Sequence, residues 1–305
     1  MANFISDFFE NRGWLGMVQQ NPTTGAFEVG GVVATGATEY TLAQFLQLDP
    51  ADYNGYTVRV TDVDAPHATA GGVLARCDDS VWTWLQTPTF TAATVPTAAE
   101  ASGWRVFVSD IGVRGSYWYS NGTRFNLDQE SVVLSQPITS PVVLAHSPLT
   151  DYICAKQYAI PTLDGKSIWG DGDMLEIHQV ANKTGELDVL NNTIYLGKAA
   201  ISADATDTNT IVTGTAHTTA STNNGLGIQQ RLLRKSSTAV KVMSPNLATG
   251  LTGASTSTDA ADTTVTSLDT GQWYIDATLR LSTSTGDSAL TLTTHSIRLI
   301  SSGAV

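Results

Sequence analysis

The stretch Trp273-Tyr274-Ile275-Asp276-Ala277-Thr278-Leu279-Arg280-Leu281 decides the fold class of this chain. Its odd positions are apolar, whereas Asp276, Thr278 and Arg280 occupy even positions. Because successive side chains of a strand point to opposite faces, the pattern predicts a β-strand with one buried and one solvated face. Half-buried strands of this kind are typical of antiparallel sheets.

The chain around this strand, residues 137–305, has the same character. Strand-like runs alternate with Thr-, Ser-, Asp- and Gly-rich turns at the roughly 8–12-residue spacing of a β-sandwich. No helix signal interrupts the region. The sequence therefore predicts an antiparallel, jelly-roll-like β-sandwich domain over 137–305. Further strands are expected at 142–145, 174–180, 193–196, 228–233, 240–243 and 290–300.

Two stretches before the sandwich match each other, Gly55–Leu85 and Gly103–Leu127. Each reads as a strand, an Asp-bearing turn and a hairpin, and the second hairpin carries Asn121-Gly122, the strongest short hairpin signal. Two copies are too few for a solenoid. The sequence predicts a duplicated β-hairpin domain over residues 27–136, with one helix at 41–48.

The first segment, residues 1–26, is rich in aromatic side chains, and Ser6 can cap a short helix there. A helix this short is marginal alone in water. Its rings must be covered either by the chain's own domain or by a docking partner, and we expect an N-terminal helical anchor that docks. The anchor residues are Phe4, Phe8, Phe9 and Trp14.

Charge and composition exclude several classes of protein. Charged residues make up 14 % of the 305 residues and the net charge is −12, which argues against binding to nucleic acid. No apolar run is long enough to predict insertion into a membrane, and no signal peptide is recognised. Cys77 and Cys154 follow no metal or redox spacing. We expect synthesis in a reducing cytoplasm.

Two parts of the sequence resemble virion proteins. Gly115-Ser116-Tyr117-Trp118-Tyr119-Ser120-Asn121-Gly122-Thr123-Arg124-Phe125 resembles a hairpin that recurs in structural proteins of tailed bacteriophages. The C-terminal pattern resembles the sandwich at the ends of phage fibre and appendage proteins. Its pieces are Gly172–Ile177, Asn192–Gly197, Gln230–Leu233, Gly286–Leu292 and Ile297–Ile300. The resemblance implies a non-enzymatic component of the virion that assembles as a homotrimer through its β domains.

No arrangement of residues predicts catalysis or a cofactor. The five histidines have no ligand spacing, and the sequence lacks a nucleophile elbow, a Walker motif and a dinucleotide fingerprint. Asp171 and Asp173 could hold a weak cation, but a calcium loop needs further ligands that are missing, which favours a plain turn. We expect no catalytic, cofactor or metal-binding residues.

The only local basic cluster contains Arg231, Arg234 and Lys235. Its plainer interpretation is a strand whose charges face solvent and deter edge pairing. Its functional interpretation is a set of ion pairs between subunits.

Aromatic side chains gather in the second hairpin at Tyr117, Trp118 and Tyr119. Core packing is one interpretation, and an exposed platform that binds a sugar or a protein is the other. Alternation places Tyr117 and Tyr119 on one face and Trp118 on the opposite face.

The leading functional hypothesis is a trimeric fibre or appendage protein of a tailed-phage virion, made in the host cytoplasm and engaged in attachment to the host surface. Its expected partners are copies of itself, other virion proteins (capsid, portal or tail) and a host-surface glycan. A capsid decoration or cement protein, or a head fibre, is an alternative within the virion. A carbohydrate-binding module unrelated to a particle is an alternative outside it.

Overall fold

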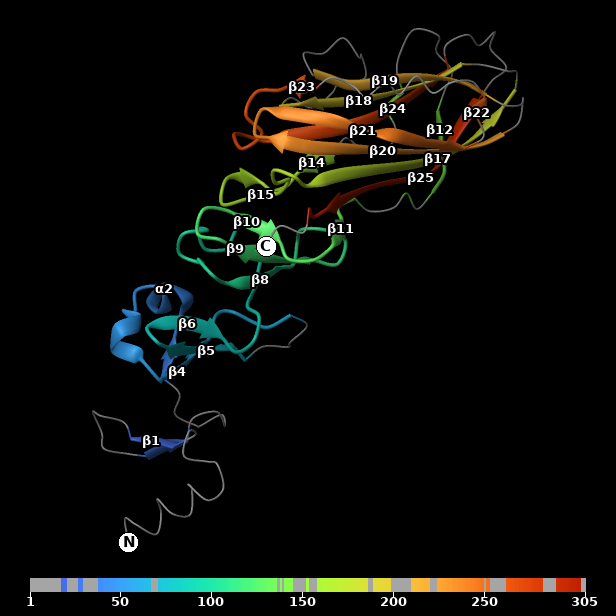
Figure 1. The fold of residues 1–305 in the computed structure, drawn as a ribbon. Helices are drawn as coiled ribbons and strands as arrows, with labels where there is room; N and C mark the ends of the chain where they lie inside the picture. Colours follow the sequence, from blue (N-terminus) through green and yellow to red (C-terminus); the bar gives the residue numbers. More distant parts are fainter. Residues whose placement is uncertain are drawn as a thin grey trace. The chain divides into compact units, whose positions relative to one another are not determined.

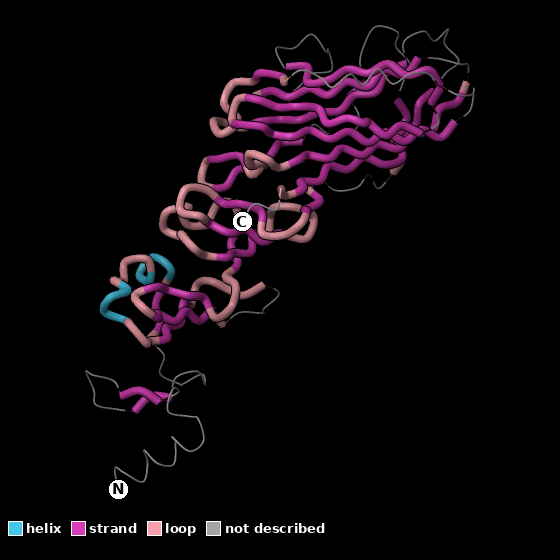
Figure 2. Tube along the Cα trace, viewed as in Figure 1, coloured by secondary structure: helices cyan, strands magenta, loops and turns pink. Residues whose placement is uncertain are grey.

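A computed structural model gives the fold of the chain (Figure 1). It describes residues 18–20, 27–29, 38–66, 71–135, 138, 140–144, 152–153, 158–185, 189–198, 210–219, 224–249, 251–252, 262–281 and 289–302. The chain divides into two compact units, Met1–Phe90 with Trp104–Phe107, and Thr91–Gly103 with Val108–Val305. Strands dominate the described residues (Figure 2), which confirms the predicted all-β class.

The first unit contains a four-stranded sheet in the order β3-β4-β5-β6. Strands β3 and β4 are parallel, and the other two pairs are antiparallel. A separate antiparallel hairpin joins β1 to β2. The strands are β1 (Val18–Gln20), β2 (Phe27–Val29), β3 (Glu39–Tyr40), β4 (Thr57–Val60), β5 (Val73–Asp78) and β6 (Val81–Trp84).

Helix α2 (Leu42–Phe45) lies between β3 and β4 in the chain. Thr41 caps it, because its hydroxyl accepts from the Gln44 N–H while the Gln44 side chain accepts from the Thr41 N–H. The predicted helix at 41–48 is thus confirmed but shorter. A 3-10 helix, η2 (Pro50–Tyr53), follows it, and Pro50 disfavours a helical backbone at the residue before it.

The second copy of the predicted duplication contains a sheet in the order β10-β9-β8-β7. Its strands are β7 (Thr89–Phe90), β8 (Arg105–Val108), β9 (Ser116–Ser120) and β10 (Phe125–Leu127). Both copies therefore run from a two-residue strand through a longer strand into a hairpin.

Corresponding hydrogen bonds recur in the two copies. They are Leu42 N to Asp62 Oδ1 and Ala92 N to Asp110 Oδ1, Gly55 N to Cys77 O and Gly103 N to Ser120 O, and Leu85 N to Leu74 O and Asp128 N to Tyr117 O. These bonds align Cys77 with Ser120 and Leu85 with Asp128. The strand, the Asp-bearing turn and the hairpin of the first copy thus have counterparts in the second.

Two antiparallel sheets form the sandwich in the second unit. One has the order β11-β25-β17-β20-β21-β23, with β12 also on β25, and the other has the order β13-β24-β18-β19-β22, with β14 also on β24. A short hairpin, β15–β16, stands apart from them. The strands are β11 (Ser131–Val133), β12 (Val142–Leu144), β13 (Tyr152–Ile153), β14 (Tyr158–Ile160), β15 (Thr162–Leu163), β16 (Lys166–Ser167), β17 (Met174–Thr184), β18 (Val189–Gly197), β19 (Thr210–Thr219), β20 (Asn224–Ser236), β21 (Ala239–Thr249), β22 (Leu251–Thr252), β23 (Thr263–Thr264), β24 (Trp273–Leu281) and β25 (Ala289–Ile300).

The core of the sandwich follows the alternation of its strands. Leu175 and Ile177 of β17 are buried, as are Ile275 and Leu279 of β24. Late strands return to lie beside early ones, β25 beside β17 and β24 beside β18, and such long returns are typical of Greek-key and jelly-roll connections. All seven predicted sandwich strands are present, and most extend beyond the predicted bounds.

The division into units differs from the predicted boundary between 27–136 and 137–305. Strand β11, which lies before that boundary, pairs with β25 inside a sandwich sheet. Arg124 donates to the Ser167 carbonyl at 3.0 Å, and Lys166 Nζ donates to the Thr123 carbonyl at 2.6 Å. The second hairpin therefore belongs to the same compact unit as the sandwich.

Candidate functional site

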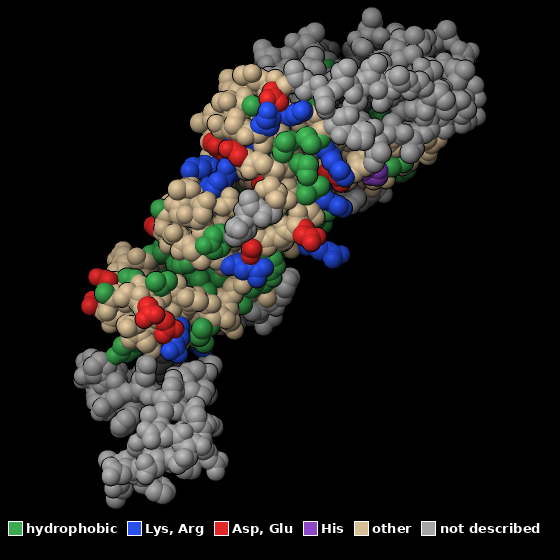
Figure 3. All heavy atoms as spheres, viewed as in Figure 1, with side chains coloured by type: hydrophobic (Ala, Val, Ile, Leu, Met, Phe, Trp, Pro, Cys, Tyr) green, Lys and Arg blue, Asp and Glu red, His purple; other side chains and the backbone are tan. Residues whose placement is uncertain are grey.

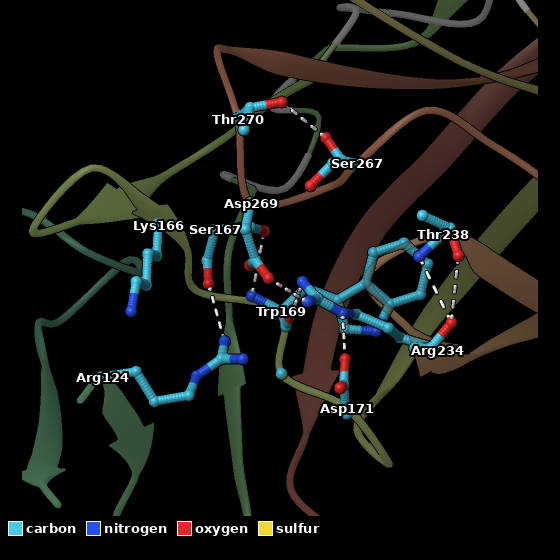
Figure 4. A network of polar contacts seen from close by, with 12 residues as sticks. Arg124, Lys166, Ser167, Trp169, Asp171, Arg234, Thr238, Ser267, Asp269 and Thr270 are labelled. Atoms are coloured by element: carbon cyan, nitrogen blue, oxygen red, sulfur yellow. Dashed lines mark hydrogen bonds and ion pairs between the residues drawn. The ribbon is translucent and has the colours of Figure 1, made fainter.

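A buried arginine stands at the centre of a polar network at one end of the sandwich (Figure 4). The Arg234 side chain is fully buried on β20, and its Nε donates to Asp171 Oδ1 at 2.6 Å. Its Nη2 donates to Asp269 Oδ2 at 2.8 Å, and its Nη1 donates to the Trp169 carbonyl. One guanidinium thus joins two loops to a sheet, in the planar fork geometry that suits arginine.

The loop from 168 to 173 is held by its own polar groups as well. Asp173 Oδ2 accepts from the Gly170 N–H at 3.0 Å, and Asp173 Oδ1 accepts from the Ser302 N–H at 3.0 Å. The Trp169 indole donates to the Asp173 carbonyl at 2.9 Å. Burial raises the pKa of Asp173 above its usual value.

These contacts give the two aspartates of the predicted turn separate structural roles. Asp171 neutralises Arg234, and Asp173 accepts main-chain hydrogen bonds. Among the described residues, no three His, Cys, Asp or Glu side chains are grouped as a metal ion would require. The arrangement supports the interpretation of this segment as a structural turn.

The basic cluster is paired within the chain. Arg231 contacts Glu176 at 2.8 Å, and Lys235 contacts Asp262 at 2.6 Å. For Arg234 the expectation of an ion pair between subunits is wrong, because its buried guanidinium is taken up by Asp171 and Asp269. For the partly exposed Arg231 and Lys235, an ion pair between subunits remains a prediction.

We expect Arg234→Ala to lower the free energy of unfolding by about 2 kcal/mol, measured by urea denaturation. The variant loses three hydrogen bonds and leaves the buried Trp169 carbonyl without its donor. The effect stays below that of breaking a fully buried pair because Asp171 and Asp269 remain partly hydrated. Lys235→Ala is the matched control, since it removes an exposed pair and should change the stability by less than about 0.5 kcal/mol. Equal effects of the two variants would contradict the central role of Arg234.

The predicted aromatic platform is divided between two faces of β9. Trp118 is fully buried, and its indole donates to Ser116 Oγ at 2.8 Å. Trp118 therefore belongs to the core, and its inclusion in an exposed platform is wrong. Tyr117 and Tyr119 are half-buried on the opposite face, as the alternation predicts.

A larger aromatic cluster lies in the first unit, where the rings of Trp82, Trp84 and Trp104 pack around Phe45. The ring of Phe45 lies 4.9 Å from Trp82 and 5.1 Å from Trp84, measured between centroids. Trp104 packs edge-on against Trp84 at 5.0 Å. The alternation of Trp82 and Trp84 along β6 was the available signal, because it places both rings on the face that α2 covers. The indole N–H groups of Trp82 and Trp84 are buried, and no described residue supplies a hydrogen-bond acceptor for them.

Asp276 and His295 are among the buried titratable groups of the sandwich. Asp276 is 1 % exposed, so the expectation that it lies on a solvated face is wrong. Burial raises the pKa of Asp276 to about 7 and lowers the pKa of His295 to about 4. Within the described part of the chain, neither carboxylate oxygen of Asp276 nor Nε2 of His295 has a hydrogen-bond partner.

Some predicted residues lie outside the described residues. They are Phe4, Phe8, Phe9, Trp14 and Cys154. Cys77 is a buried free thiol, and burial raises its pKa.

Comparison with protein-family models and with curated protein sequences finds no match for this chain. Among the described residues, no helix combines the length and the apolar character needed to cross a membrane.

Proposed function

We propose that this protein is a non-enzymatic structural component of a tailed-phage virion, a homotrimeric fibre or appendage protein. The observation that carries the proposal is the set of hydrogen bonds between the second copy of the duplication and the sandwich. Besides the contacts of Arg124 and Lys166, Asp164 accepts from the Ala98 N–H at 2.9 Å and the Ser301 N–H donates to the Glu130 carbonyl at 3.0 Å. Modules linked only by flexible segments move relative to one another, whereas hydrogen bonds connect these two at four places, which favours a rigid structural part.

The surface of the described residues is also compatible with a structural role in a virion. Figure 3 shows charged side chains in small groups, often with both signs side by side, separated by uncharged surface on the face in view. A surface of few charges and many hydroxyl groups is compatible with close packing against copies of the chain or other virion proteins.

Recognition of a host-surface glycan would fall to Tyr117 and Tyr119. Both side chains are half-buried on one face of β9, with Asn126 opposite Tyr119 on β10. Neighbouring rings and an amide on one sheet face offer stacking surfaces and hydrogen bonds for a sugar.

Gold-labelled antibodies against the purified protein, applied to purified phage particles, test the proposal. We expect the label on the particle, with native mass spectrometry of the free protein giving three chains or a multiple of three. Label on the tail supports a fibre or appendage, and label distributed over the head supports the decoration alternative. Unlabelled particles together with a monomer would overturn the virion proposal and favour a separate carbohydrate-binding module.

A further inference from the structure

The open edge of the first sheet carries unusual side chains. Among the described strands, β6 pairs with β5 alone, so its other side is a sheet edge. Val81 is 61 % exposed and Leu85, directly after the strand, is 49 % exposed. Among the described residues, Val143 is the only other large apolar side chain with such exposure. An exposed apolar sheet edge is a template for pairing with another strand.

The duplication supplies an internal comparison for this edge. In the second copy, the residues equivalent to Val81 and Leu85 are Arg124 and Asp128, as the shared hydrogen bonds align them. Arg124 is also engaged by the Ser167 carbonyl. Charged flanking residues are a common protection against edge-to-edge pairing. The same motif thus has a protected edge in one copy and an apolar edge in the other.

The hydrogen-bond pattern of the hairpin shows which main-chain groups the edge offers. The Leu85 N–H donates to the Leu74 carbonyl, and Thr83 lies opposite Arg76 in the same register. In an antiparallel pair, hydrogen-bonded positions alternate along each strand. The main-chain groups of Val81, Thr83 and Leu85 therefore face β5. Those of Trp82 and Trp84 face the open edge.

The edge sequence is complementary to itself. Val81-Trp82-Thr83-Trp84-Leu85 reads similarly in both directions about Thr83. Antiparallel pairing with an identical strand would place Val81 opposite Leu85, Trp82 opposite Trp84, and Thr83 opposite Thr83. Apolar, aromatic and Thr–Thr cross-strand pairs all stabilise a sheet. The outward main-chain groups of Trp82 and Trp84 would bond each other across the contact.

We propose that β6 binds β6 of a second copy of this chain, edge to edge, about a two-fold axis through Thr83. The inference goes beyond the proposed function, because a two-fold contact cannot close a three-fold ring. In a trimeric protein it joins separate trimers, and a closed pair of trimers contains six chains. The contact extends the first sheet from four strands to eight across the axis.

A self-crosslink tests the contact on the full chain. Thr83 would face its own copy at a non-hydrogen-bonded position, where Cα atoms lie about 4.5 Å apart, within disulfide range. Thr83→Cys is expected to form a covalent dimer under mild oxidation. Asn126→Cys is the matched control, because Asn126 is the equivalent position of the protected edge. A yield for Thr83→Cys no higher than for Asn126→Cys or wild type would overturn the proposal.

Charge repulsion gives a second readout that does not need a disulfide. Val81→Lys/Leu85→Lys puts lysine opposite lysine twice, at exposed positions where the fold tolerates them. We expect the dissociation constant of the two-fold contact to rise on the order of 100-fold. Native mass spectrometry should then change from six chains to three. A change from two chains to one supports the β6 contact and refutes the trimer, whereas wild-type protein with only three chains refutes the β6 contact and keeps the trimer.

Discussion

Replacing Trp118 with alanine is expected to lower the free energy of unfolding by about 4 kcal/mol. Trp118 is among the largest fully buried side chains described, and it fills the interior of the second copy behind β9. Its indole N–H donates to Ser116 Oγ, which in turn donates to the Ile111 carbonyl. Alanine would leave a large cavity and remove one donor from this chain of hydrogen bonds. Urea denaturation followed by circular dichroism measures the change.

The neighbouring Tyr119 provides a matched control for Trp118. It lies on the same strand but on the half-exposed face, so Tyr119→Ala should cost about 1 kcal/mol or less. The main expected effect of Tyr119→Ala is on glycan binding and not on stability. Tyr119→Ala should weaken binding to a glycan array while the protein stays folded. Equal destabilisation by the two variants would contradict the assignment of Trp118 to the core.

Asp276→Asn is expected to stabilise the protein above pH 7 by about 2–4 kcal/mol. The pKa of the buried Asp276 is raised to about 7 in the folded state, compared with about 3.9 for an unfolded chain. Between these values the folded state holds a proton that the unfolded state has lost. The stabilisation from this group is therefore complete below about pH 4 and is lost as the pH rises through about 7. Asparagine cannot ionise, so the variant does not lose this stability as the pH rises.

The titration of His295 has the opposite effect on the free energy of unfolding, so the two groups can be told apart by their pH profiles. Its pKa is lowered to about 4 in the folded state, so stability rises as the pH increases from about 4 to about 6.5. In Asp276→Asn, unfolding free energies measured from pH 4 to 8 should increase up to about pH 6.5 and then level off. In His295→Gln they should decrease up to about pH 7. A double variant without pH dependence in this range is the control, and an unchanged profile for Asp276→Asn would refute the burial of its charge.

Local patterns predicted most of the strand framework. The period-two alternation of 273–281 placed β24 with its observed bounds, and the matched turns around Asp62 and Asp110 predicted the duplication. These features depend on residues close together in the sequence. Their physical causes, alternation across a sheet and hairpin turn chemistry, can be recognised in a single chain.

Long-range contacts could not be predicted in the same way. The even positions of β24 suggested that Asp276 is solvated, yet it is buried, because what covers a sheet face is not encoded in the strand itself. Arg234 likewise appeared as part of a basic surface cluster. Its partners Asp171 and Asp269 come from two distant loops, and only the sandwich brings them together.

The position of β17 in its sheet has a consequence for how the protein folds. Both neighbours of β17 come from later in the chain, β20 from 224–236 and β25 from 289–300. Contacts with residues nearby in the sequence do little to stabilise such a strand. Closing the long loops to its partners costs conformational entropy before the hydrogen bonds between the strands can form. Domains dominated by such non-local strand pairings fold slowly, in milliseconds to seconds. Until 289–300 arrives, β17 exposes a long unpaired edge, so premature association competes with correct folding throughout that interval.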